Sequence, residues 1–202
     1  MDLLILAILI AAGTFMLNAK EQRKRIVLLG RHLANYQIEQ LMQALTDGYL
    51  RALGESTDER RSQIWSLLGT TESQLSEQFD LFAADFAKVD KAHTHVSRLA
   101  LPIPFAEKIF PGRTFDMRRV LSIHARGIAH VVHNTDHLSP KERAYMMMAE
   151  LFLMQHSCHW FCKSKAVATA RMLAHHQTPH GQLIASVSAQ TRKAYLALIG
   201  GG

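Results

Sequence analysis

The segment from residue 2 to residue 25, DLLILAILIAAGTFMLNAKEQRKR, consists of an apolar half followed by a basic half. The run from Leu3 to Leu17 contains no charged residue, and Asn18 and Ala19 lengthen the uncharged stretch to about 17 residues. A helix rises about 1.5 Å per residue, so this stretch covers about 25 Å, near the lower end of what a bilayer core requires. Residues 1–19 are therefore predicted to form a single transmembrane anchor.

The charges that flank the apolar run predict its orientation. Asp2 is the one charged side chain before the run, whereas four cations follow it. Because basic residues are retained in the cytoplasm during insertion, we expect the N-terminus outside and the chain from about residue 20 in the cytoplasm, at the inner membrane. The same cations would contact anionic lipid headgroups at the membrane surface. They are Lys20, Arg23, Lys24 and Arg25.

Two other interpretations of the apolar run remain open at the level of sequence. A cleaved signal peptide requires a positively charged start, which Met1-Asp2 does not provide, although Leu17-Asn18-Ala19 is a passable cleavage site. A core helix of a soluble domain is rarely apolar on every face for four turns. The anchor is the favoured interpretation.

The composition of the whole chain is typical of one folded domain behind an anchor. The chain has 202 residues and is 48% hydrophobic, which is enough for a substantial core. Its net charge of +6 is moderate, and basic residues outside the juxtamembrane cluster are interspersed with acids. No nucleic-acid-binding motif is present, so nucleic acid is not an expected partner.

Apolar residues recur with a helical period along most of the chain, which predicts an all-α fold. The anchor is expected to continue into a cytoplasmic bundle of about five to six helices, residues 20–199, followed by a flexible tail, 200–202. The clearest boundary is Ser139-Pro140-Lys141-Glu142, which combines a capping serine, a proline at the first helical position and a capping-box glutamate. The expected helices are 20–53, 58–68, 71–96, 114–134, 140–176 and 188–199.

Two segments of this domain have distinctive patterns. Leu75, Phe79 and Phe82 begin a seam at steps of four and three that runs on to Val96, as expected of a helix facing another helix. Residues 98–113 form a connector in which Pro102, Pro104 and Pro111 exclude a long helix. The connector is unusually apolar, and we expect it to pack across the bundle, with contact to the membrane surface or to a partner as alternatives.

Histidines provide the candidate chemistry. His130, His133 and His137 fall within about 60° of one another on the expected helix, and imidazoles at such steps can reach a common metal ion. His124 lies instead in an apolar arc and is expected to be buried and hydrogen-bonded. Asp136-His137 has the reverse order of a His-Asp pair, which disfavours a metal-dependent phosphohydrolase.

A second cluster lies at residues 156–162. Cys158 and Cys162 share one side of the expected helix, whereas His156 and His159 share another, so a metal site would need ligands from a neighbouring helix. Zinc or a haem iron suits these ligand types, although no Cys-x-x-Cys pair or haem attachment motif is present. Reduced thiols are expected, because a disulfide at this spacing closes almost no loop. The candidate metal ligands are thus His130, His133, His137, His156, His159, Cys158 and Cys162.

Glu150 lies in the most apolar part of the expected helix 140–176. A buried carboxylate must be paired or have a raised pKa, so we expect an ion pair with Arg143, Arg119 or Arg126. A proton-handling carboxylate is the functional alternative.

The sequence contains no Gly-rich phosphate loop, nucleophile elbow, Cys-His protease pattern or glycosidase-like pair of carboxylates. We therefore expect a non-catalytic, membrane-anchored adaptor or accessory subunit, whose partners are the lipid bilayer and another protein, a membrane complex or a second copy included. The alternative is a metal- or haem-binding protein, an enzyme included, that uses the histidines of residues 124–159. Binding of nucleic acid or anionic lipid through residues 20–31 is a third possibility.

Overall fold

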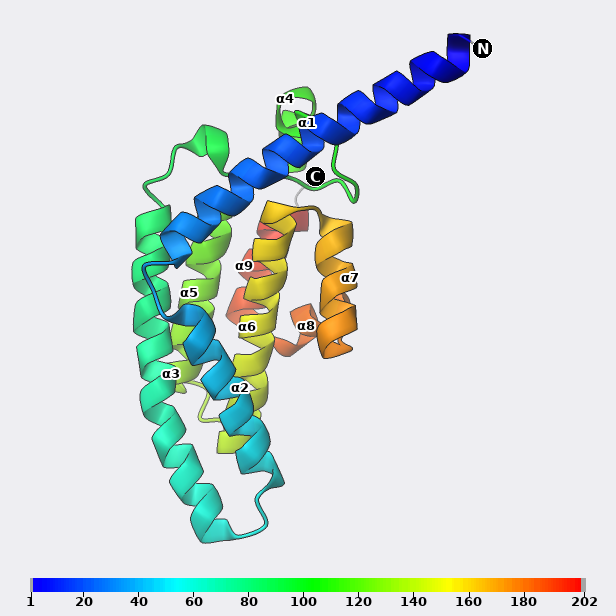
Figure 1. Cartoon of the computed structure of the whole chain (residues 1–202). Coiled ribbons are helices and arrows are strands. Elements are labelled where there is room, and N and C mark those ends of the chain that lie inside the picture. Colours follow the sequence, from blue (N-terminus) through cyan, green and yellow to red (C-terminus); the bar gives the residue numbers. More distant parts are fainter. Residues whose placement is uncertain (1, 201–202) are drawn as a thin grey trace.

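The computed structural model describes residues 2–200, and Figure 1 shows that they form a bundle of helices with one helix projecting from it. Two three-residue strands, β1 (His95–Ser97) and β2 (Thr114–Asp116), pair antiparallel, and short 3-10 turns cover Lys91–His93 and Pro111–Arg113. The prediction of an all-α fold is confirmed for the described residues. The helices are α1 (Asp2–Leu33), α2 (Ile38–Gly54), α3 (Asp58–Phe86), α4 (Ala106–Ile109), α5 (Met117–His133), α6 (Pro140–Cys162), α7 (Lys165–His176), α8 (His180–Ser186) and α9 (Ala189–Gly200).

The core lies between α2, α3, α5 and α6, and α7, α8 and α9 complete the bundle beside α6 and α5. The predicted seam is part of this core, because Leu75, Phe79, Phe82 and Phe86 are buried on α3. Phe86 also meets Phe161 of α6 edge to face, with ring centroids 5.9 Å apart. Aromatic side chains bury large apolar areas, so this seam contributes to the folding free energy and is not a free docking surface.

Helix α1 has two halves with different surroundings. Its first half, up to Leu17, projects away from the bundle, whereas its second half lies across the end of the bundle against α6 and α3 (Figure 1). Leu29 is buried there, and His32 Nδ1 lies 2.8 Å from the Asp85 carboxylate. The predicted continuity between the apolar run and the first helix of the domain is confirmed. The helix stops at Leu33 and not at residue 53, because residues 34–37 form a turn in which the Tyr36 ring packs against Phe82 of α3.

Several other boundaries differ from the prediction. Residues 58–86 form one continuous helix through Gly69, because no proline or cap interrupts it and the buried faces on either side are in phase. The helix then ends ten residues earlier than predicted, and Val96 belongs to β1. Thr114 belongs to β2, so α5 begins at Met117, where the Asp116 side chain accepts a hydrogen bond from the Arg118 backbone N–H at 3.0 Å.

The C-terminal third contains one confirmed boundary and two corrections. The capping box at Ser139 is confirmed, with the Ser139 backbone N–H donating to Glu142 Oε2 at 3.0 Å. The expected helix 140–176 is divided at Lys163 and Ser164, because the Ser164 hydroxyl caps α7. Helix α8 was not predicted. In the expected flexible tail, Gly200 is the last residue of α9, and residues 201–202, like Met1, lie outside the described residues.

Candidate functional site

The first half of α1 is the most exposed apolar segment of the described chain. None of the side chains in its most apolar window is buried, and α1 is the candidate among residues 2–200 that is long and apolar enough to cross a membrane. The exposed fractions are 83% for Leu3, 64% for Leu9 and 74% for Phe15. This exposure is inconsistent with a core helix of this domain, which was one of the alternatives at the level of sequence.

The predicted membrane-surface cations follow directly on the same helix. Lys20, Arg23 and Lys24 are exposed, whereas Arg25 turns toward the bundle and its guanidinium carbon lies 5.9 Å from the Phe161 ring centroid. Three of the four predicted cations are therefore exposed to solvent, and the fourth holds the helix against the domain.

The connector, residues 98–113, does not pack across the bundle, so that prediction is wrong for most of its apolar side chains. The Arg98 backbone N–H donates to the Arg113 carbonyl at 2.8 Å, which closes the connector into a loop that leaves the bundle and returns to it. Ala106 is buried, but most of the larger apolar side chains of the connector are exposed. Their exposed fractions are 68% for Leu101, 41% for Ile103, 40% for Phe105, 58% for Ile109 and 43% for Phe110.

The connector lies beside α1 at the point where α1 leaves the bundle. The Asn18 side-chain amide donates to the Pro102 carbonyl at 3.1 Å, and Glu21 and Arg25 line small pockets together with connector residues. In Figure 1, α4 lies next to α1, at the end of the bundle opposite the turn between α2 and α3. The exposed apolar loop and the exposed apolar helix thus belong to one end of the molecule.

A groove lined by arginines lies between α5 and α9. Arg98, Arg118, Arg119 and Arg126 line it with Asp116 as the one acidic residue of the lining. Asp116 is already paired, since Arg118 Nη2 lies 2.7 Å from its carboxylate. Burial raises the pKa of Asp116, but hydrogen bonds from Arg118 and Thr94 outweigh burial and leave this pKa below its usual value. The groove therefore carries a positive charge that suits an anionic ligand.

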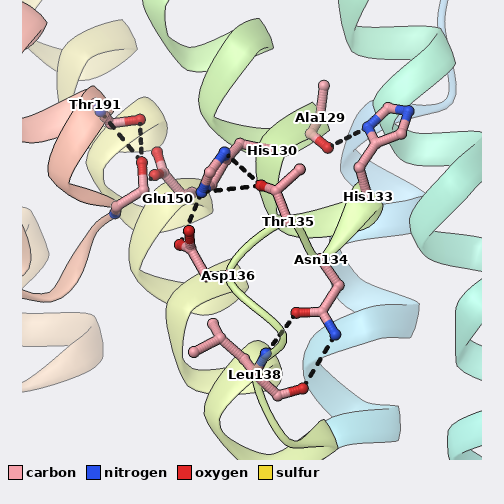
Figure 2. A network of polar contacts seen from close by, with 10 residues as sticks. Ala129, His130, His133, Asn134, Thr135, Asp136, Leu138, Glu150 and Thr191 are labelled. Carbon is pink, nitrogen blue, oxygen red and sulfur yellow. Dashed lines mark hydrogen bonds and ion pairs between the residues drawn. The ribbon is translucent and has the colours of Figure 1, made fainter.

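The three candidate ligands of α5 and the following turn do not converge. Figure 2 shows His130 and His133 pointing in different directions. His130 Nε2 lies 2.8 Å from the Asp136 carboxylate, whereas His133 Nδ1 donates to the Ala129 carbonyl at 2.6 Å. His137 follows the end of the helix in the left-handed backbone region, with φ 53°. The expected common face ends because α5 ends at His133.

The second cluster is also divided. His156 stacks on His180 of α8, with ring centroids 4.0 Å apart, and His156 Nε2 lies 3.1 Å from the Thr169 hydroxyl. Burial, then the charge of His180, lowers the pKa of His156 to about 3. Cys158 and Cys162 are free thiols, and burial raises the pKa of Cys162 to about 11. Burial also lowers the pKa of His159, followed by the charge of Arg171. Residues 2–200 contain no group of three or more His, Cys, Asp or Glu side chains placed to hold a metal ion.

His124 is buried and hydrogen-bonded, as predicted. Its Nε2 lies 2.9 Å from the Ser157 hydroxyl, and that hydroxyl donates to the Leu153 carbonyl at 3.0 Å. The Tyr195 hydroxyl of α9 lies 3.3 Å from the same oxygen. Burial lowers the pKa of His124 to about 3, so the imidazole is neutral at physiological pH. This network connects α5, α6 and α9.

The expected ion pair of Glu150 with an arginine is wrong. Glu150 Oε1 accepts from the Ser188 backbone N–H at 3.1 Å, and burial raises the pKa of the carboxyl while Thr191 and Ser188 act to lower it. Arg143 pairs instead with the buried Glu72 of α3, at 3.0 Å. Glu72 was missed because its local sequence, rich in polar residues, gave no sign of burial.

Other residues that sequence analysis missed are His180, Tyr195, Arg98 and Arg118. Arg119 and Arg126 were considered only as partners of Glu150. For the groove a signal was present, since Arg118, Ser122 and Arg126 are spaced by four and share one face of a helix. Comparison of the chain with protein-family models, with curated proteins and with solved structures found no match.

Proposed function

We propose that this protein is a membrane-anchored, non-catalytic adaptor that holds a helical interaction domain at the inner face of the membrane. The observation that carries the proposal is the fully exposed apolar half of α1, continuous with a half that is packed on the domain. Such an exposed apolar helix is costly in water, whereas a bilayer covers it. Because α1 is one continuous helix, the position of its apolar half in the membrane would determine where the domain lies.

The order of charges along α1 supports an orientation with the domain in the cytoplasm. Lys20, Arg23 and Lys24 are exposed directly after the apolar half, where headgroups would lie. Retention of the helix is favoured over its cleavage, because cleavage after Ala19 would remove Asn18, which donates to the connector at Pro102.

The arginine-lined groove between α5 and α9 is the face that we assign to the partner. Arg119 and Arg126 are exposed there, and Arg126 Nη1 donates to the Ser122 hydroxyl at 2.8 Å. Arginines form strong bidentate contacts with carboxylates, so the partner that fits is an acidic segment of another protein. Positive charge at an interface chiefly increases association rate and specificity.

The test is crosslinking and affinity capture from native membranes solubilised under mild conditions, with the full chain as bait. Arg119→Glu combined with Arg126→Glu is expected to abolish stoichiometric capture and to leave membrane association unchanged. The matched control, Arg60→Glu at the start of α3, reverses an exposed charge far from the groove and is expected to capture normally. If the variant with Arg119→Glu and Arg126→Glu captures the partner as well as the Arg60→Glu control does, the groove is not the partner face.

The alternative function, metal or haem binding by the histidines of residues 124–159, has weaker support. Among these candidates, His156 stacks on His180, which lies outside the predicted set, and residues 2–200 contain no group of three or more side chains placed to hold a metal ion. Elemental analysis and an absorption spectrum of protein prepared without an affinity tag distinguish the two functions. Stoichiometric zinc or iron would favour this alternative over the adaptor.

A further inference from the structure

The connector exposes many large apolar side chains for so short a segment. Five of its sixteen residues are large, apolar and at least 40% exposed. Two prolines within the first half of this group, and one directly after it, keep the segment from forming one long helix. Exposed apolar residues are ordinary when they are scattered, but a contiguous group of them marks a binding surface. These five are Leu101, Ile103, Phe105, Ile109 and Phe110.

The backbone of the connector is strained at one of these residues. Phe105 has φ 56° and ψ 25°, the left-handed region that residues with a bulky side chain rarely adopt. Such strain persists where the surrounding structure enforces it, and it is concentrated at sites that bind something. Here it presents the Phe105 ring at the start of α4, with the Lys108 ammonium 5.6 Å from the ring centroid.

Rigid attachments hold the connector at the membrane end of the molecule. Trp160 Nε1 donates to the Ser97 carbonyl at 3.0 Å, and the Ala166 backbone N–H donates to the Ala100 carbonyl at 3.1 Å. On the other side, Asn18, the first polar residue after the apolar run of α1, donates to Pro102. The level at which α1 would leave the hydrocarbon is therefore the level of the connector (Figure 1).

The charges at this level suit an anionic lipid surface. Lys108 and Arg113 are exposed on the connector, and Lys20, Arg23 and Lys24 are exposed on the neighbouring turns of α1. The connector contains one acidic residue against three basic ones. Apolar side chains flanked by lysine and arginine are the composition of segments that lie in a membrane interface.

We infer that the connector is a second membrane contact, which inserts its apolar side chains into the headgroup region of the leaflet from which α1 emerges. The bilayer is the occupant of this surface, because the connector is continuous with the segment that we assign to the bilayer. Two contacts, a spanning helix and an interfacial loop, fix the tilt and rotation of the domain relative to the membrane plane. This inference rests on the proposed anchor.

The test measures lipid contact at three sites of the full chain in vesicles made of equal parts of phosphatidylcholine and phosphatidylglycerol. In a Cys158→Ala, Cys162→Ala background, an environment-sensitive fluorophore is attached at Ile109→Cys in the connector, at Leu9→Cys in the anchor or at Leu67→Cys. Leu67 is the matched control, because it is an exposed leucine on α3, 74% exposed and remote from the connector. Lipids that carry a nitroxide near the headgroup or near the end of the acyl chain serve as quenchers, and circular dichroism confirms folding of each variant.

The inference predicts a blue shift and quenching at residue 109, stronger with the nitroxide near the headgroup, together with deeper quenching at residue 9 and none at residue 67. Quenching at residue 9 with none at residue 109 would overturn the connector contact and leave the anchor intact. Absence of quenching at both residue 9 and residue 109 would overturn the anchor and the contact together. Crosslinking between two copies through residue 109, without quenching there, would overturn the lipid contact in favour of self-association.

Discussion

At the scale of single residues, Gly127 shows how closely α5 packs against α6 and α9. A Cβ atom at this position would collide with the Thr191 hydroxyl and with the Glu150 carboxylate, both of which are buried. We expect Gly127→Ala to lower the free energy of unfolding by about 1–3 kcal/mol, the usual cost of overpacking.

The control for this substitution is Gly69→Ala in α3, where nothing lies within 4 Å of the added methyl group. Because alanine is favoured over glycine within a helix, Gly69→Ala is expected to raise the free energy of unfolding by up to about 1 kcal/mol. Urea unfolding of the full chain in mild detergent measures both, and equal effects of the two substitutions would refute the close approach at Gly127.

The ion pair between the half-buried Arg143 and the buried Glu72 provides a second prediction. The Tyr49 hydroxyl donates to Glu72 Oε1 at 2.6 Å, and burial, then the Glu72 charge, raises the pKa of this tyrosine. Removal of the guanidinium would leave the carboxylate buried without a counter-charge. Arg143→Met is therefore expected to lower the free energy of unfolding by about 3–5 kcal/mol.

Adding Glu72→Gln to Arg143→Met removes the uncompensated charge and is expected to restore part of the lost stability. Urea unfolding of the single and double variants measures this coupling. A double variant no more stable than Arg143→Met would show that the pair does not act as described.

His124 gives a prediction of pH dependence. Its pKa in the folded state is about 3, whereas an imidazole in an unfolded chain has a pKa of about 6.5. The unfolded state therefore binds more protons, and the contribution of His124 to stability is complete above pH about 6.5 and is lost as the pH falls toward about 3. Between pH 7 and pH 5 the loss attributable to this residue is about 2 kcal/mol.

The measurement is the free energy of unfolding from pH 7 to pH 5 for the natural protein and for His124→Gln, which keeps a donor to Ser157 but does not titrate. The variant is expected to have the shallower dependence on pH. Identical slopes would mean that His124 is protonated to the same extent in the folded and unfolded states.

At the scale of elements, local sequence signals determine some boundaries of helices and strands, and tertiary contacts determine the others. The start of α6 was predictable, because Ser139 and Glu142 cap the helix through their own hydrogen bonds and Pro140 is favoured at the first helical position. The interruption after Leu33 was not predictable, because the apolar period continues across it and the turn is fixed by contacts of Tyr36 with Phe82 on α3. Likewise β2 exists only through its pairing with β1, nearly twenty residues earlier in the chain.

The left-handed backbone of Phe105 in the connector gives a further prediction. Because Phe105 adopts the left-handed region, glycine should fit its backbone better than alanine, by about 1 kcal/mol. Phe105→Gly is therefore expected to unfold at a higher urea concentration than Phe105→Ala, and comparison of these two removes the effect of losing the ring.

The same pair at Leu101, which is not among the residues with positive φ, serves as the control and should show the opposite order. If Phe105→Ala proves the more stable member of its pair, the connector is not strained at this position.

At the scale of the whole molecule, the sequence predicted the apolar N-terminal helix and the all-α fold better than the candidate site. The apolar helix depends on a single contiguous run, so no tertiary information was needed to predict it. A ligand set depends on where separate helices meet, and the stacking of His156 on His180 involves a helix that the sequence did not indicate. The arginine-lined groove requires the approach of α9 to α5, which no spacing along the chain reveals.

The central claim is that α1 crosses the membrane and leaves the helical domain on the cytoplasmic side. The measurement that tests it most directly is labelling of single cysteines, Leu3→Cys or Ser66→Cys, by a membrane-impermeant maleimide in a Cys158→Ala, Cys162→Ala background. If α1 crosses the membrane in this orientation, residue 3 is labelled in intact cells, residue 66 is labelled only after permeabilisation, and alkaline carbonate does not extract the chain. Labelling of residue 66 in intact cells, or release of the chain by carbonate, would contradict this claim.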